Sequence, residues 1–163
     1  MQIIKFSQQY TEKLIDLILN IQVNEFSIAI TRKDQPDLAD ISGFYQVGKG
    51  NFWLAVDDDN TVIGTIGLID IGNNQAALRK MFVDTRFRGK NYGIAQSLLN
   101  TVCQWCQKSQ IDQIYLGTTA AYHAAHRFYE KNDFLEITKS ELPLDFPVMA
   151  VDSKFYVKSF KNI

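Results

Sequence analysis

With 163 residues, of which 46% are apolar and 21% charged, the chain has the length and composition of one globular domain, which we assign to residues 1–163. Its formal net charge of −1 excludes the excess of Lys and Arg that binding to nucleic-acid phosphates requires, so no nucleic-acid partner is expected. No apolar run has the length of a membrane span or a signal peptide, which predicts a cytoplasmic protein without a membrane partner.

The first half of the chain alternates between strand and helix patterns. Residues 2–6 predict a short strand, and the apolar face formed within residues 10–21 predicts a helix. A second, short helix is predicted around residues 38–45, where it could cover a substrate pocket. Three further apolar or alternating runs, separated by polar turns, predict strands at 51–56, 62–71 and 76–83.

A basic, glycine-containing loop follows the third of these strands and leads into a long helix. Arg86, Arg88 and Lys90 alternate there with Gly89 and Gly93. The first amide N–H groups of a helix lack partners within the helix, and the helix dipole adds partial positive charge at that end. Because glycines let the backbone approach a phosphate closely, this loop predicts a pyrophosphate site. A surface connection whose charges are merely solvated is the alternative.

The second half of the chain completes a mixed sheet. Residues 114–117 predict a short buried strand, and residues 120–131 predict a helix with Ala125 and Tyr129 on one face. Two final strands are predicted at 134–138 and 151–160. The element order therefore predicts an α/β fold with a mixed central sheet of about six to seven strands, flanked by about four helices.

Cys103 and Cys106 have the C-x-x-C spacing found in redox and zinc sites. They lie well inside the long predicted helix and not at its N-terminus, where a reactive thiolate is stabilised. His123 and His126 lie on a separate predicted helix. We therefore expect two reduced, packed cysteines and no metal.

Two segments resemble the GNAT superfamily of N-acetyltransferases. The sequence RGKNYG at residues 88–93 resembles its [RQ]-x-x-G-x-[GA] pyrophosphate loop, with Asn91 where the first glycine is usual. Asn tolerates a left-handed backbone better than most residues, so the loop is expected to keep its shape. Residues 122–134 resemble the superfamily segment N-x-x-A-x-x-x-Y-E-K-x-G-F, with Tyr122 in place of Asn and Asp133 in place of Gly. The predicted element order is also that of the superfamily.

The resemblance implies a GNAT fold with acetyl-CoA as co-substrate. In such enzymes, amides of the central strand bind the pantetheine arm, the basic loop binds the pyrophosphate, and the second segment also contacts the cofactor. The matching positions are Met81, Phe82 and Val83 on the strand, Arg88, Gly89, Lys90, Asn91, Tyr92 and Gly93 in the loop, and Tyr122, Ala125 and Tyr129 in the segment. Tyr129 matches the Tyr that protonates the departing thiolate, and core packing is the alternative for a helical Tyr.

The general base is less clearly indicated by the resemblance. Many relatives carry a Glu on the central strand, and Ala77 occupies the matching position here. Glu25, Asp70, His126 and a chain of waters are the open candidates for removing the proton of the amine. Each of these side chains also has a purely structural interpretation.

Arg79 is the candidate ligand of the acceptor. By strand parity it faces the same side as Ala77 and Met81, and the adjacent Lys80 points the opposite way. An Arg at this place can bind a carboxylate through two hydrogen bonds, which predicts an amino acid or a similar acid-bearing amine as acceptor. Further expected contacts of the acceptor are Glu25, Tyr45 and Trp53. Pairing of Arg79 with a neighbouring Asp or Glu is the alternative.

Together these features predict an acetyl-CoA-dependent N-acetyltransferase that acts on the primary amine of a small molecule by direct attack. Two rivals are left open, a non-catalytic acyl-CoA-binding regulatory domain and a protein or peptide N-acetyltransferase. The sequence also leaves the oligomeric state open, a homodimer included.

Overall fold

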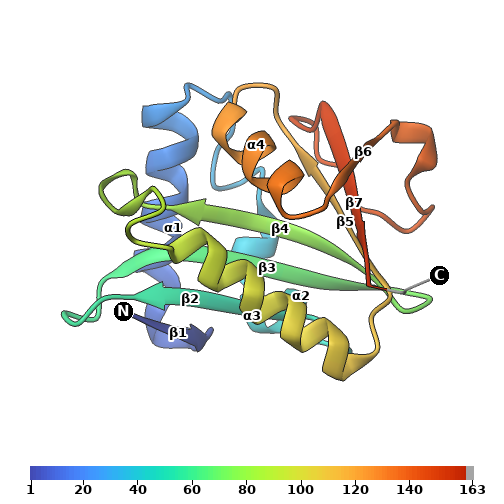
Figure 1. Cartoon of the computed structure of the whole chain (residues 1–163). Helices are drawn as coiled ribbons and strands as arrows, with labels where there is room; N and C mark the ends of the chain where they lie inside the picture. Colours follow the sequence, from blue (N-terminus) through green and yellow to red (C-terminus); the bar gives the residue numbers. More distant parts are fainter. Residues whose placement is uncertain (161–163) are drawn as a thin grey trace.

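The computed structural model describes residues 1–160, and these contain one seven-stranded sheet (Figure 1). The strands follow the order β1-β2-β3-β4-β5-β7-β6, and all neighbouring pairs are antiparallel except β4 and β5, which are parallel. Their bounds are β1 Gln2–Lys5, β2 Asn51–Val56, β3 Val62–Gly72, β4 Gln75–Val83, β5 Gln113–Thr118, β6 Leu135–Ile137 and β7 Lys154–Ser159.

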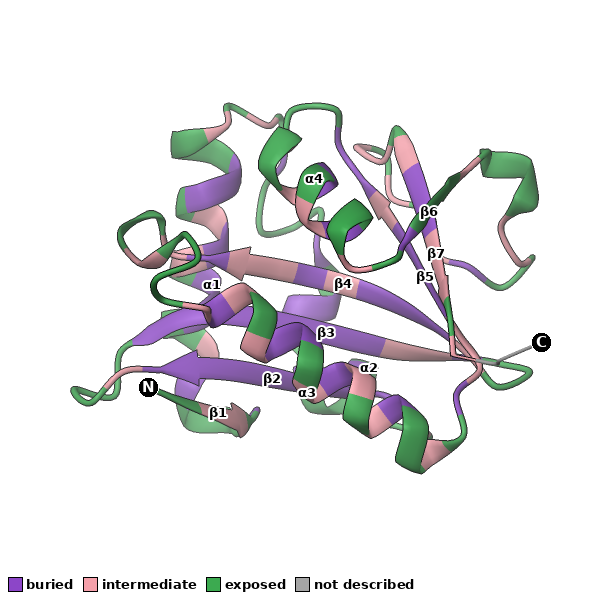
Figure 2. Cartoon of the chain, viewed as in Figure 1, coloured by how far each residue is buried: buried purple, intermediate pink, exposed green. Residues whose placement is uncertain are grey.

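Within the described residues, four α-helices cover the two faces of this sheet. They are α1 Thr11–Leu19, α2 Ile41–Tyr45, α3 Ile94–Ser109 and α4 His123–Lys131. The first two pack on one face around Leu14, Ile41 and Phe52, and the last two pack on the other around Leu98 and Tyr129. Each helix turns its buried stripe towards the strands (Figure 2), as amphipathic spacing requires. The predicted mixed α/β architecture is confirmed.

None of the helices in residues 1–160 is long and apolar enough to cross a membrane. The cytoplasmic location, the homodimer and the single domain over residues 1–163 stay predictions. The element boundaries agree with the predicted ones to within a few residues, except in the first helix. That helix continues past α1 as a π-helical turn, Asn20–Glu25, which carries Gln22 to the edge of a cleft.

The parallel strands β4 and β5 are paired over only part of their length. Their register joins Gln75 to Gln113 and ends at Ala77 and Tyr115. Beyond these residues the two strands diverge, as Figure 1 shows. The divergence opens the sheet in its middle, and residues of α4 and of the segment before β7 line the opening.

A β-bulge interrupts β4 beside this opening. Gly67 of β3 is paired with Arg79, but Thr65, two residues earlier, is paired with Phe82, three residues later. Lys80 takes up the extra residue with a left-handed φ of +55°, and its carbonyl oxygen accepts a 2.6 Å hydrogen bond from the Thr65 hydroxyl.

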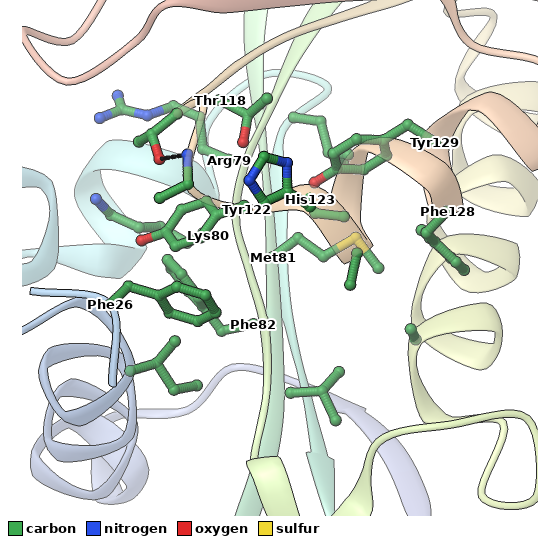
Figure 3. A pocket seen from close by; sticks show the side chains of 18 of the residues that line it. Phe26, Arg79, Lys80, Met81, Phe82, Thr118, Tyr122, His123, Phe128 and Tyr129 are labelled. Atoms are coloured by element: carbon green, nitrogen blue, oxygen red, sulfur yellow. Dashed lines mark hydrogen bonds between the residues drawn. The ribbon is translucent and has the colours of Figure 1, made fainter. Parts of the chain in front are cut away.

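The bulge reverses the side-chain alternation of the strand. Ala76 and Leu78 face α3 before it, and Met81 packs against that same cluster after it. Figure 3 accordingly shows Arg79 and Lys80 on one side of β4 and Met81 on the other. The prediction that Arg79 shares its side with Met81, and that Lys80 points away from Arg79, is therefore wrong.

Candidate active site

A cleft of about 1210 Å³ occupies the opening between β4 and β5 (Figure 3). The end of β4, the loop before α3, the start of α4 and the segment before β7 form its walls. Of the predicted site residues, the cleft is lined by Arg79, Met81, Phe82, Val83, Arg88, Gly89, Lys90, Gly93, Tyr122, Ala125 and Tyr129. The structure thus brings the predicted pyrophosphate loop, the central strand and the α4 segment to one place.

The loop before α3 derives its shape from two glycines. Gly89 has a φ of +104° and Gly93, the N-cap of α3, has a φ of +63°, both in the left-handed range that favours glycine. Asn91 is not among the residues with positive φ, so the expectation that it stands in for a left-handed glycine does not apply. Asn91 and Tyr92 belong to the loop but do not line the cleft.

Arg88 is paired within the protein. Its Nε donates to the carbonyl oxygen of Val83 at 2.9 Å, and its Nη2 donates to Glu25 Oε1 at 2.8 Å, with a second contact between Nη1 and Glu25 Oε2. Glu25 does not line the cleft. Because this ion pair occupies both carboxylate oxygens, we no longer assign Glu25 as the base or as an acceptor ligand.

Tyr129 of α4 lies at the cleft wall with only 6% of its surface exposed. Its ring packs against Phe134 and Tyr156 at centroid distances of 5.4 and 5.9 Å. Burial raises the pKa of its hydroxyl well above the ordinary tyrosine value, which keeps the proton on this group at neutral pH.

Tyr122, where Asn is usual, begins α4 and reaches across the cleft to the other face. Its ring makes edge-to-face contacts with Phe26 at 4.8 Å and with Phe82 at 6.1 Å (Figure 3). Burial raises the pKa of its hydroxyl to about 12. At the far end of α4, Asp133 adopts a left-handed φ of +68°, so it takes the backbone conformation of the glycine that it replaces.

Arg79 and Lys80 meet a buried carboxylate that sequence reasoning missed. Asp37 lies 4.0 Å from Arg79 Nη2 and 3.6 Å from Lys80 Nζ, and its Oδ2 accepts a 2.5 Å hydrogen bond from the Tyr45 hydroxyl. Lys80 Nζ also donates to Gln35 Oε1 at 2.6 Å. Burial lowers the pKa of Lys80 to about 8, because desolvation outweighs the attraction of Asp37.

Arg79 is largely, but not fully, buried, and its guanidinium is weakly bound. Its side chain is 12% exposed, and Nη2 donates to the thioether sulfur of Met149 at 2.7 Å, a weak acceptor. The guanidinium also lies 5.8 Å from the ring centroid of Phe44. At 4.0 Å, Asp37 is beyond hydrogen-bond distance and already serves Lys80 and Tyr45. The guanidinium can therefore accept a further anion from the cleft.

Two of the predicted bases lie elsewhere. Asp70 caps turns at the far end of β3, where its oxygens accept from the backbone N–H groups of Lys49 and Gly72 at 2.9 Å. His126 is buried, with Nε2 2.8 Å from the carbonyl oxygen of Thr119. Neither residue lines the cleft, so we no longer assign either to proton removal.

Two of the predicted acceptor contacts are core residues. Tyr45 is fully buried, and its hydroxyl serves Asp37. Trp53 packs edge-on against Trp105 at 5.6 Å, on the face covered by α3. Since neither lines the cleft, the structure does not support contact of Tyr45 or Trp53 with the acceptor. Tyr45 acts only indirectly, through its hydrogen bond to Asp37, on the part of the cleft around Arg79 and Lys80, which we call the acceptor end.

Asp152, just before β7, lines the cleft and was also missed. It stands in an irregular segment, for which periodicity gives no signal, and only the folded chain brings it to β4. Within residues 1–160, no group of three or more His, Cys, Asp and Glu side chains is arranged to hold a metal ion. Cys103 and Cys106 are free thiols, the second fully buried.

The family model described as Acetyltransferase (GNAT) family matches residues 15–134. A GNAT-family acetyltransferase from Staphylococcus aureus Mu50 is 46% identical with a TM-score of 0.95, covering 98% of this chain and 99% of that one. An acetyltransferase from Streptococcus agalactiae 2603 is 30% identical with a TM-score of 0.92, covering 98% of both chains.

Among curated proteins, the N-acetylaspartate synthetase of Rattus norvegicus is 38% identical over 106 residues. The match covers 64% of this chain and 35% of that protein, so the chain spans only about a third of the relative's length. The extent of the family match and the shared fold agree with the resemblance of the two sequence motifs. The chain therefore belongs to the acetyltransferase (GNAT) family.

Proposed function

We propose that this protein transfers the acetyl group of acetyl-CoA to the primary amine of a small molecule that carries a carboxylate. The observation that carries the proposal is the largely buried guanidinium of Arg79, whose side chain is 12% exposed and whose closest acceptor is a thioether sulfur. Buried charges are normally paired and hydrogen-bonded, so this group favours an anionic ligand. Its place at the cleft wall makes the acceptor the natural source of that anion.

The residues of the cleft fit acetyl-CoA. Beyond Ala77, the edge of β4 that faces β5 is not paired with it, so those N–H groups between Met81 and Val83 that point to this edge are available to a pantetheine arm. Gly89 and Gly93 leave open space before the N-terminus of α3, whose first N–H groups have no partner within the helix, and Lys90 adds a positive charge. In this proposal Arg88, already paired with Glu25, shapes the loop and leaves the phosphates to these neighbours.

The chemistry follows from the same wall of the cleft. The neutral amine attacks the thioester carbonyl carbon, and an amide near Met81 or Phe82 stabilises the developing oxyanion. Tyr129 then donates its proton to the departing thiolate, and its raised pKa ensures that the hydroxyl is protonated when the thiolate forms. Tyr122 encloses the cleft with Phe26 and limits the access of water to the reacting groups.

The comparisons support an acidic acceptor independently of Arg79. The curated relatives named N-acetylaspartate synthetase have, by their name, an amino acid with a carboxylate as acceptor. We therefore propose an amino acid or a close analogue as the acceptor class, with the side chain of that amino acid left open.

A thiol-release assay with acetyl-CoA tests the proposal. Free amino acids should release CoA thiol faster than their amides or methyl esters, and faster than polyamines, aminoglycosides or peptides with free N-termini. Equal rates with an amino acid and its methyl ester would refute the carboxylate. Tight binding of acetyl-CoA without thiol release from any acceptor would favour a regulatory acyl-CoA-binding domain instead.

A further inference from the structure

Many relatives carry a Glu as the base at the position that Ala77 occupies here. The cleft nevertheless contains a carboxylate from another part of the chain. Among residues 1–160, Asp152 is the only Asp or Glu that lines the cleft. It lies two residues before β7, and the backbone N–H of the next residue, Ser153, donates to the Thr118 carbonyl of β5 at 2.9 Å. This bond fixes Asp152 beside β5, past the point where β5 leaves β4.

Two local features hold the carboxylate in place. The Met149 N–H donates to Asp152 Oδ2 at 2.9 Å, and the Asp152 N–H donates back to the Met149 carbonyl at 3.0 Å. The carboxylate also lies flat against Gly117 of β5, since a Cβ at Gly117 would stand 2.6 Å from Oδ2 and 2.7 Å from Cγ. Only glycine at this place leaves room for the carboxylate at the cleft wall.

The charges that face Asp152 come from β4. Arg79 and Lys80 both attract its carboxylate, and Arg79 also contacts Met149 of the same turn at 2.7 Å. Burial nevertheless raises the pKa of the Asp152 carboxyl above the ordinary aspartate value, because desolvation outweighs these cations and the Met149 N–H. A carboxylate in this setting is a stronger base than one in water.

We propose that Asp152 is the catalytic base, which binds the ammonium group of the acceptor and removes its proton while Arg79 binds the acceptor carboxylate. The inference rests on the proposed function, because it assumes an amine acceptor in this cleft. An amino acid carries its ammonium and its carboxylate on one carbon. Asp152 and Arg79 carry the opposite charges and lie close together, because both contact Met149, Asp152 at its backbone N–H and Arg79 at its sulfur.

The protons balance in the proposed acetyl transfer. One proton passes from the ammonium to Asp152 and then to solvent, which frees the nitrogen lone pair. The C–N bond forms, the C–S bond breaks, and the thiolate takes a proton from Tyr129. The nitrogen loses its second proton, which restores Tyr129 through solvent, so that amide, CoA thiol and one released proton are the products.

Asp152→Asn is the test variant, because the amide oxygen can still accept the Met149 N–H and preserve the turn. It should lower kcat roughly 10²-fold or more, remove the acid limb of the pH profile of kcat, and leave the KM for acetyl-CoA unchanged. Asp145→Asn, an exposed residue of the same segment, is the matched control and should behave as wild type. Wild-type kcat and an unchanged pH profile in Asp152→Asn would overturn the proposal.

His123, which also lines the cleft, is the rival base. A rate loss in His123→Gln that is absent from Asp152→Asn would overturn the assignment of Asp152. A failure of the proposed function can be distinguished from a failure of this inference. If the enzyme acetylates a polyamine in place of amino acids, the proposed acceptor carboxylate is refuted, but Asp152→Asn still tests whether Asp152 is the base.

If no amine is turned over, the pKa of the Asp152 carboxyl, measured by ¹³C NMR titration, tests the assignment of Asp152 as a base. A pKa above the ordinary value of about 3.9 supports a carboxylate tuned as a base, and a value at or below it overturns the proposal.

Discussion

Replacing Lys80 with Met should remove a pH-dependent part of the stability of this protein. Lys80 is 3% exposed at its side chain and rests on Asp37 and Gln35, both in the segment between α1 and α2. Its charged form is therefore held in a nearly water-free place, with one carboxylate to balance it. Such a lysine releases its proton more easily in the folded state than in the unfolded chain.

The size of the effect follows from the pKa of Lys80, which burial lowers from 10.5 to about 8. Between these values the unfolded state binds more protons, so this contribution to the free energy of unfolding rises with pH and is lost as pH falls through about 8. At 1.36 kcal/mol per pH unit the full contribution is about 3 kcal/mol, of which about 1 kcal/mol falls between pH 8 and pH 9.

Urea unfolding at pH 7, 8 and 9, with reductant present, measures this contribution as a difference between wild type and Lys80→Met. The difference is the right quantity, because the raised pKa of the buried Cys106 acts in the opposite direction above pH 9 in both proteins. Lys108→Met, at an exposed position of α3, controls for the loss of one cation. If the wild-type and Lys80→Met stabilities run parallel from pH 7 to 9, the reasoning is refuted.

Three further predictions concern the cleft. Gly93→Val should weaken acetyl-CoA binding in calorimetry, because Gly93 has a φ of +63° at the start of α3, and unchanged affinity in a folded variant would remove the pyrophosphate assignment. Tyr129→Phe should lower kcat roughly 10²-fold with acetyl-CoA binding intact, whereas wild-type turnover would make Tyr129 a packing residue. Arg79→Lys should raise the acceptor KM on the order of 10-fold without changing that for acetyl-CoA, and an unaltered acceptor KM would exclude Arg79 as its ligand.

The parts of the fold that local sequence controls were predictable. A continuous apolar run located β2 at Asn51–Val56 as expected, and the 3.6-residue period located the buried stripe of α3. The loop before α3 was also predictable, because Gly89 and Gly93 are where the backbone adopts left-handed φ values. In each of these cases, the residues that determine the local structure lie within that element or within a few residues of it.

The acceptor end of the cleft was predicted only in part, because contacts between residues far apart in the sequence determine which side chains lie there. Strand parity failed at Lys80, since the bulge depends on how Thr65 of β3 is paired, 15 residues earlier. Asp37 reaches Lys80 only through the packing of the segment between the first two helices. Asp152 reaches the cleft through the hydrogen bond from Ser153 to Thr118 and through its contact with Gly117, both residues of β5. No local pattern marks any of these partners.

The charges gathered at the acceptor end bear on which amines can enter. Arg79 and Lys80 supply two cations and Asp37 and Asp152 supply two anions, so the enclosed charges balance before the acceptor binds. A zwitterionic amino acid leaves this balance at zero, whereas a polyamine would add positive charge beside two buried cations. Transfer of the ammonium proton to Asp152 also leaves the total charge unchanged. The amine can thus become a nucleophile in the cleft without creating a net charge there, which is the physical reason to expect an amino acid and not a polycation.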